Sequence, residues 1–214
     1  MRQFILGDCM NKENGLPSFP DNHFGLAIVD PPYGIGVTNN KSGIGRRKGD
    51  VKASYKIGDW DKQPPKPEYF KELFRVSKNQ IVWGGNYFID LWHSPCKGFI
   101  CWYKKFSNDV SFASVEFAWT SFDRMSKHYT QHPSKGNRIH PTQKSVGLYS
   151  ALLNDYANQG DLILDTHVGS ASSLIACESK GFNYVGYEID KDYYEAAKNR
   201  MAKGIQKDMF AVRD

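Results

Sequence analysis

Four consecutive residues, Asp30-Pro31-Pro32-Tyr33, combine side chains and spacing that could do chemistry on an amine. Asp30 and the carbonyl of Pro31 can together accept both protons of an exocyclic amine, because neither proline has a competing backbone donor. Two such acceptors favour a pyramidal nitrogen, and the carboxylate stabilises the positive charge that develops when this nitrogen attacks an electrophile. Tyr33 can stack on the ring that carries the amine. The alternative is a strand that ends in a Pro-Pro turn with a capping aspartate.

A second group of residues, between positions 165 and 190, is typical of a pocket for a nucleoside. Gly169 lets the turn after an apolar run approach a ligand closely. Glu188 follows the next apolar run, where an acidic residue can accept hydrogen bonds from ribose hydroxyls. The sequence has neither G-x-G-x-x-G nor G-x-x-x-x-G-K-[ST], which disfavours pyrophosphate and triphosphate ligands. An ordinary strand–helix–strand unit is the alternative.

Five short apolar runs, each predicted to form a buried strand, must position these residues. They end in Asp8, Asp30, Gly84-Gly85, Asp165 and Glu188. The run at 162–164, a helix from Ser170 to Lys180 and the run at 184–187 form a crossover, so these two strands are predicted to be parallel. The sequence therefore predicts an α/β fold with a mostly parallel sheet, helices on both faces, and the five end groups at one edge.

Local signals predict further elements. Pro67 begins a helix to about Val76, Ser145 caps a second helix, and Asp190 caps a last one to about Lys203. The segments 98–103 and 115–120 are predicted to be strands, and 121–144 is predicted to be irregular.

The composition limits the classes of protein that fit. The length of 214 residues predicts one domain, and 40% hydrophobic residues exclude a disordered chain. The net charge of +5 permits a polyanionic partner without requiring one. No apolar run approaches the ~18 residues of a membrane span, and we expect no signal peptide. Four cysteines without C-x-x-C spacing disfavour a disulfide scaffold and fit a cytosol, and the spacing of His128, His132 and His140 does not indicate a metal site.

Six strings between residues 7 and 190 follow one another in a characteristic order. They are Gly7-Asp8, Asp30 to Tyr33, Trp83 to Phe88, His140-Pro141-Thr142-Gln143-Lys144, Asp165 to Ser173 and Tyr187 to Asp190. With these strings the chain resembles DNA adenine-N6 methyltransferases of the β-type permutation, in which the catalytic motif precedes the cofactor motif. The His-Pro-Thr-Gln-Lys string is the most specific of the six.

The resemblance implies a Rossmann-like class I methyltransferase fold with circularly permuted motifs. It also implies methyl transfer from S-adenosylmethionine to the N6 amine of a flipped adenine in DNA. Asp30, Pro31, Pro32 and Tyr33 match the catalytic motif. The implied cofactor-binding residues are Asp8 at the adenine of the cofactor, Glu188 at its ribose, Asp165 and Gly169 in the cofactor turn, and Thr142 and Lys144 beside the methionine tail. No metal is implied.

The cofactor turn departs from the family pattern D-P-F-x-G-S-G-T-T. Ala171 replaces a glycine, His167 replaces an aromatic residue, and Ser145 stands where proline is usual after Lys144. An alanine methyl would crowd the cofactor, or would cost backbone freedom if its φ is positive. These departures keep open a catalytically weak DNA-binding module with the same fold.

Other amine substrates also stay open. N4-cytosine DNA methylation uses the same chemistry, although Asp30 favours adenine, because cytosine-N4 enzymes more often carry serine at this position. RNA and the glutamine side chain of a protein are further alternatives. The basic loop 34–66 and the long insertion 98–138 favour nucleic acid over protein.

A base inside a duplex hides its amine and must be flipped out, at a cost of roughly a few kcal/mol. The basic segment 34–66 adjoins the catalytic turn, and we expect its Arg46, Arg47 and Lys48 to hold backbone phosphates. The segment of about 104–138 is the candidate target-recognition insertion. We expect a bacterial or phage-encoded protein of the bacterial cytoplasm. A homodimer and a restriction-modification role are both compatible with the sequence, which identifies no interface.

Overall fold

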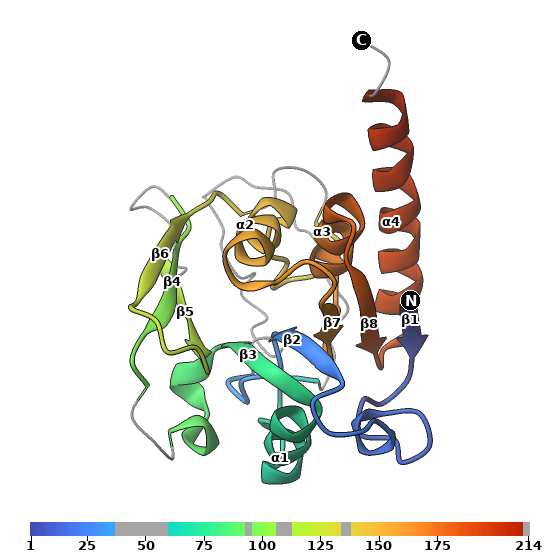
Figure 1. The fold of residues 1–214 in the computed structure, drawn as a ribbon. Helices are drawn as coiled ribbons and strands as arrows, with labels where there is room; N and C mark the ends of the chain where they lie inside the picture. Colours follow the sequence, from blue (N-terminus) through green and yellow to red (C-terminus); the bar gives the residue numbers. More distant parts are fainter. Residues whose placement is uncertain (37–59, 93–95, 106–112, 134–137, 212–214) are drawn as a thin grey trace.

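An eight-stranded sheet with the order β1-β8-β7-β2-β3-β5-β4-β6 runs through the described part of the molecule. The computed structural model describes residues 1–36, 60–92, 96–105, 113–133 and 138–211, without the side chains of 205–211. Figure 1 shows helices on both faces of the sheet. The predicted α/β fold with a mostly parallel sheet is therefore confirmed.

The five strands that were predicted to end in ligand groups form the parallel part of the sheet. In spatial order they are β1 (Arg2–Leu6), β8 (Asn183–Glu188), β7 (Leu162–Asp165), β2 (Phe24–Val29) and β3 (Ser77–Trp83), and each neighbouring pair is parallel. Their carboxyl ends therefore meet at one edge of the sheet, as predicted. Because β2 lies between β7 and β3, the turn after β2 stands between the turns of these two strands.

Three further strands extend the sheet beyond β3. β5 (Val115–Thr120) is antiparallel to β3 and to β4 (Phe99–Tyr103), and β6 (Lys127–Thr130) pairs with β4 in parallel. The prediction that 121–144 is irregular was wrong for β6. β6 is a four-residue edge strand in which only Tyr129 is buried, so its sequence shows no alternation of apolar and polar residues. These residues form a strand because they pair with β4.

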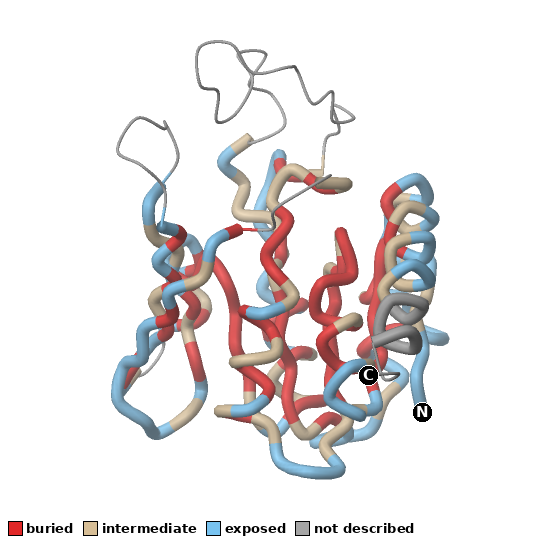
Figure 2. Tube along the Cα trace, turned by 90° about the horizontal axis from the view of Figure 1, so that it is seen from above, coloured by how far each residue is buried: buried red, intermediate tan, exposed pale blue. Residues whose placement is uncertain are grey.

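Helices cover both faces of the sheet (Figure 1). They are α1 (Pro67–Val76) on one face, and α2 (Val146–Tyr156), α3 (Ser172–Lys180) and α4 (Lys191–Ala211) on the other. Ile28 and Ile81 belong to the core on the α2 and α3 face, whereas Val29 and Val82 belong to the core on the α1 face. This alternation follows from the strand period of two residues. Figure 2 shows the buried strands in red inside the more exposed helices and loops.

The helix ends follow the predicted signals with two differences. Pro67 begins α1, and the Ser145 hydroxyl accepts a hydrogen bond from the Leu148 N–H at 3.1 Å to cap α2. α4 continues to Ala211, beyond the predicted end at Lys203. α3 begins at Ser172 instead of Ser170, because Ala171 has a φ of 59°, which is not a helical value.

Within the described residues, no helix is long and apolar enough to cross a membrane. In the same part of the chain, no three His, Cys, Asp or Glu side chains are placed to hold a metal ion. All four cysteines are free thiols.

Candidate active site

Two cavities meet at the edge where the parallel strands end. The larger one has a volume of about 470 Å³, and the smaller one about 90 Å³. The residues that line both include Asp30, Pro32, Trp60, Thr142 and Gln143. Gly169 and Glu188 line the smaller cavity. Asp30 therefore stands at the boundary between the larger cavity and the turn that was predicted to bind a nucleoside.

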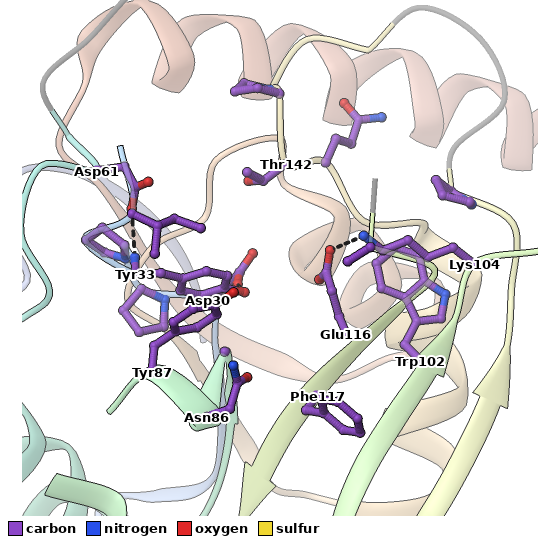
Figure 3. A pocket seen from close by; sticks show the side chains of 18 of the residues that line it. Asp30, Tyr33, Asp61, Asn86, Tyr87, Trp102, Lys104, Glu116, Phe117 and Thr142 are labelled. Atoms are coloured by element: carbon purple, nitrogen blue, oxygen red, sulfur yellow. Dashed lines mark hydrogen bonds and ion pairs between the residues drawn. The ribbon is translucent and has the colours of Figure 1, made fainter. Parts of the chain in front are cut away.

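Asp61 fixes the turn after β2, which carries the predicted catalytic residues (Figure 3). The buried Asp61 carboxylate accepts hydrogen bonds from the Tyr33 N–H at 2.8 Å and the Gly34 N–H at 3.0 Å through the same oxygen. Sequence reasoning did not identify Asp61. It lies 28 residues beyond Tyr33 within a polar segment, and no local pattern marks it as a partner of the turn.

The Tyr33 ring is held on three sides. Its hydroxyl donates a hydrogen bond to Asp30 Oδ1 at 2.6 Å, and its ring stacks on Tyr87 with a centroid distance of 4.9 Å and an interplanar angle of 16°. The ring also lies on the backbone of Gly84, where a Cβ atom would come within 2.6 Å of ring carbons. Burial, and then the charge of Asp30, raise the Tyr33 pKa well above its usual value, so the hydroxyl remains a donor.

The second oxygen of Asp30 binds the ammonium group of Lys144. Lys144 Nζ lies 2.5 Å from Asp30 Oδ2 and 3.2 Å from Glu116 Oε2, and it stands 5.0 Å from the centre of the Trp83 ring. The other oxygen of Glu116 forms an ion pair with Lys104. Burial acts to lower the Lys144 pKa, but Asp30 and Glu116 outweigh it, and the pKa is raised. Lys144 is therefore a buried, charged ammonium.

Glu116 and Trp60 also line the larger cavity, and sequence reasoning did not select either of them. The signal for Glu116 was present, since it is the one charged residue in the apolar segment 115–120. Trp60 gave no local signal.

The turn between β7 and α3 faces the end of β8. Glu188 Oε2 accepts a hydrogen bond from the Gly169 N–H at 2.8 Å, and Oε1 accepts one from the Asp190 N–H at 2.9 Å. A carboxylate oxygen has two lone pairs, so each can still accept a hydroxyl donor from a ligand. Gly169 has a φ of 54°, and the atoms nearest to an added Cβ would belong to the His140 ring, at 3.6 Å. These residues fit the ribose and the close backbone approach of a nucleoside cofactor.

Two other predicted cofactor residues line neither cavity. Asp165 Oδ1 accepts a hydrogen bond from the His167 N–H at 3.0 Å, and Oδ2 accepts one from the Ser173 hydroxyl, so this carboxylate closes the turn itself. Burial raises the Asp165 pKa to about 7. Asp8 is exposed at the end of β1, and its side chain accepts a hydrogen bond from the Met10 N–H at 2.8 Å. Contacts of both carboxylates with the cofactor stay predictions.

The departures in the cofactor turn have structural counterparts. Ala171 is fully buried and has a φ of 59°, the conformation in which a glycine is less strained. His167 Nδ1 lies 2.9 Å from Thr166 Oγ1, and the ring packs edge-on against Tyr69 at a centroid distance of 5.5 Å. Burial lowers the His167 pKa to about 4, so the ring is uncharged at neutral pH and packs as an aromatic residue.

The His-Pro-Thr-Gln-Lys string joins the two cavities. His140 Nδ1 lies 3.1 Å from Thr142 Oγ1, and the His140 ring packs edge-on against Tyr193 at 4.4 Å between centroids. Burial lowers the His140 pKa to about 4. The Ser172 hydroxyl donates to the Lys144 carbonyl at 2.7 Å, which ties the string to α3. Thr142 and Lys144 both line the smaller cavity together with Gly169 and Glu188, and their position beside the methionine tail of the cofactor stays a prediction.

The predicted DNA contacts are described only in part. Arg46, Arg47 and Lys48 lie outside the described residues. In the segment 104–138, Lys104 and Arg138 line the larger cavity.

Comparisons with known proteins identify the family of the chain. The DNA methylase family (N6_N4_Mtase) matches residues 80–199, more than half of the chain. The chain is 25% identical over 219 residues to "Putative methylase YubD" of Escherichia coli (strain K12), covering 94% of this chain and 91% of that protein.

Two solved structures show the same fold. A crystal structure of an M1.HpyAVI–SAM complex has a TM-score of 0.61 and 18% identity, covering 94% of this chain and 100% of that one. The PvuII DNA methyltransferase (cytosine-N4-specific) also has a TM-score of 0.61, with 13% identity, covering 95% of this chain and 89% of that one. Since the matched residues include the His-Pro-Thr-Gln-Lys string, the cofactor turn and Glu188, this chain belongs to the DNA methylase family.

Proposed function

We propose that this DNA methylase transfers the methyl group of its cofactor, S-adenosylmethionine, to the exocyclic N6 amine of a flipped adenine in DNA. One observation carries the proposal: Asp30 lines both the larger cavity and the smaller cavity that contains Gly169 and Glu188. A carboxylate in this position can hold an amine between a base and a methyl donor.

The smaller cavity supports the cofactor end of this site. S-adenosylmethionine, when bound, supplies an electrophilic methyl group on a sulfonium. Glu188 would accept hydrogen bonds from the ribose hydroxyls, and Gly169 would let the turn approach them. We assign Thr142 and Lys144 to the methionine side, and Asp8 to the adenine side. Asp165 would act by fixing the turn.

The larger cavity supports the base end. Its volume of about 470 Å³ lies within the usual range of small-ligand pockets. Asp30 and the Pro31 carbonyl would accept the two amine protons, the Asp30 carboxylate would stabilise the developing positive charge, and the Tyr33 ring would stack on the base. Pro32 would hold the turn rigid.

Adenine is the preferred target, because Asp30 matches the adenine-specific form of the catalytic motif. Cytosine N4 is the second candidate, since the PvuII enzyme named above is cytosine-N4-specific and has the same fold. Labelled methyl transfer to mixed-sequence DNA, followed by nucleoside analysis, separates them. We expect N6-methyladenine. N4-methylcytosine would show that cytosine N4 is the target instead of adenine N6. DNA without label would refute the proposed activity.

We further propose that residues 1–214 act as one methyltransferase domain in a bacterial or phage-infected cytoplasm. Arg46, Arg47 and Lys48 would hold phosphates, and about 104–138 would read the target sequence. Each phosphate contact contributes about −0.9 to the slope of log K against log[salt]. Neutralising the three basic residues together should make this slope less negative by about 2–3, and an unchanged slope would contradict their role.

A further inference from the structure

Four buried or partly buried charged side chains alternate in sign between the outer strands and the catalytic turn. They are Lys104 beside β4, Glu116 on β5, Lys144, and Asp30 after β2. The Lys144 side chain, which is 2% exposed, contacts both carboxylates. Figure 3 shows Glu116 and Lys104 paired at the wall of the larger cavity, across from Asp30. Two positive and two negative charges make this chain of groups neutral.

In this arrangement both oxygens of Asp30 already have donors. The Tyr33 hydroxyl occupies Oδ1 at 2.6 Å, and the Lys144 ammonium occupies Oδ2 at 2.5 Å. Tyr33 is fixed by Gly84 and Tyr87, whereas Lys144 has a second carboxylate within reach. Each oxygen keeps a second lone pair, but the charged ammonium competes with an incoming amine for the Asp30 carboxylate. An amine therefore binds Asp30 more strongly once Lys144 has moved away, and Lys144 can move more easily than Tyr33.

The Glu116 carboxylate can accept a hydrogen bond from the displaced Lys144 ammonium. Its Oε2 atom is buried and lies 3.2 Å from Lys144 Nζ, yet among the described residues it has no partner in hydrogen-bond geometry. A buried ammonium that lost its only carboxylate would be left uncompensated, which is strongly unfavourable. With Glu116 beside it, the ammonium can move towards one carboxylate as it leaves the other.

We propose that Glu116 is a positioning residue for the methyl transfer: it shares the Lys144 ammonium with Asp30, and accepts it when the target amine takes its place on Asp30. The proposal rests on the proposed role of Asp30. It involves an exchange of hydrogen bonds only. The amine donates to Asp30 Oδ2, Lys144 donates to Glu116 Oε2, and Lys104 stays on Glu116 Oε1.

The first test compares Glu116→Gln with Glu116→Asp, because glutamine keeps the shape and aspartate keeps the charge. Rates are measured in a single turnover, with saturating cofactor and a duplex that the wild-type protein methylates. At pH 7 we expect Glu116→Gln to be at least about tenfold slower, and Glu116→Asp to recover most of the rate. Glu116 does not line the smaller cavity, so cofactor affinity should stay within about twofold. The exposed residue Glu195 provides a matched control, Glu195→Gln, with the wild-type rate.

The pH dependence separates this role from a structural one. Among the described residues, several charged and titratable groups surround Lys144. They include Asp30 and Tyr33 from the turn after β2, Glu116 from β5, Lys104 beyond β4, His140 from its own string and Tyr149 from α2. Without Glu116, Lys144 loses one of its acidic partners and keeps the same burial, so it loses its proton at lower pH. A neutral Lys144 releases Asp30. The deficit of Glu116→Gln should therefore shrink between pH 7 and pH 9, whereas a loss from misfolding would not depend on pH in this way.

A second variant and a measurement without substrate complete the test. In a Lys144→Met background, Glu116→Gln should slow the transfer by less than about twofold, since the ammonium that it positions is gone. In protein labelled with ¹³C at the lysine ε-carbons, the Lys144 resonance, identified by its loss in Lys144→Met, should titrate at lower pH in Glu116→Gln.

Three results would overturn the proposal: a wild-type rate in Glu116→Gln, an equal loss at every pH, or an unshifted Lys144 titration. A wild-type protein that methylates no DNA would refute the proposed function, and with it any role of Glu116 in the transfer. The titration would still show whether Glu116 holds the ammonium, because it needs neither cofactor nor DNA.

Discussion

Replacing Gly84 by alanine should disturb the proposed catalytic turn through a single methyl group. Gly84 has a φ of 69°, which costs an L-residue about 1–2 kcal/mol. Its added Cβ would also lie 2.6 Å from Tyr33 Cδ1 and Cζ, and closer still to Cε1. Such overpacking costs about 1–3 kcal/mol, because the ring is held by Tyr87 and Asp30 and cannot withdraw freely. The two costs predict a loss of about 2–5 kcal/mol in the free energy of unfolding.

Gly181 provides the matched control. It has a φ of 77°, and nothing lies within 4 Å of an added Cβ, so Gly181→Ala should show the backbone cost of about 1–2 kcal/mol alone. Urea unfolding of both variants isolates the contact with the Tyr33 ring. Displacing this ring by about 1 Å should also slow methyl transfer by about 100-fold in Gly84→Ala. Gly181→Ala should keep the wild-type rate.

Removing the ring tests the same contact from the other side. In a Tyr33→Ala background, Gly84→Ala should cost about as much as Gly181→Ala, because the methyl group then meets no ring. The reasoning would be refuted if Gly84→Ala and Gly181→Ala unfolded with the same free energy in the otherwise unchanged protein.

Three further changes probe the site. Asp30→Ala should abolish labelled methyl transfer but spare S-adenosylmethionine binding measured by calorimetry; retained turnover would contradict the role of Asp30. Asp61→Ala should destabilise the protein to urea by about 1–3 kcal/mol for each of the two backbone N–H groups that it leaves unpaired, and an unchanged midpoint would show that water replaces the carboxylate. For Asp165, the folded pKa of about 7 lies above the ordinary value of 3.8, so its contribution to stability is complete below pH 3.8 and is lost as the pH rises through 7. The wild-type protein should therefore lose more stability than Asp165→Asn between pH 5 and pH 8, by an amount on the order of a few kcal/mol, and parallel curves would contradict the pKa.

Most of the parallel sheet could be predicted from the sequence because its signals are local. The runs at 26–29 and 162–164 are short, apolar and followed directly by polar turns, as buried parallel strands are. Ser145 marked its helix because a capping hydroxyl acts on an N–H group only three residues away. The meeting of the strand ends then followed from the rule that links parallel strands by crossovers.

The contacts that hold the turn after β2 could not be predicted in this way, because they join distant parts of the chain. Asp61 caps the turn from a segment with no regular pattern, and Lys144 reaches Asp30 across 114 residues. Glu116 was visible as a charge in an apolar strand, but its partners depend on how β5 pairs with β3 and β4. The resemblance implied that Lys144 lies beside the cofactor, and only the packed structure adds its contact with the Asp30 carboxylate.

The position of Ala171 bears on how far the cofactor turn departs from its family. Two costs were expected from this alanine: crowding of the cofactor and a strained backbone. The strain is present, because φ is 59°, at about 1–2 kcal/mol for an L-residue. The Ala171 methyl group does not crowd the smaller cavity. Gly169, Ser170 and Ser172 of the same turn line this cavity, and Ala171 does not. Arg200 donates to the Ser170 carbonyl at 2.5 Å and to the Ser172 hydroxyl at 2.9 Å, so both neighbours of Ala171 are tied to α4. The alanine therefore affects the stability of the turn more than the space available to the cofactor. The contacts with Arg200 and the burial of the Ala171 methyl group offset the cost in stability.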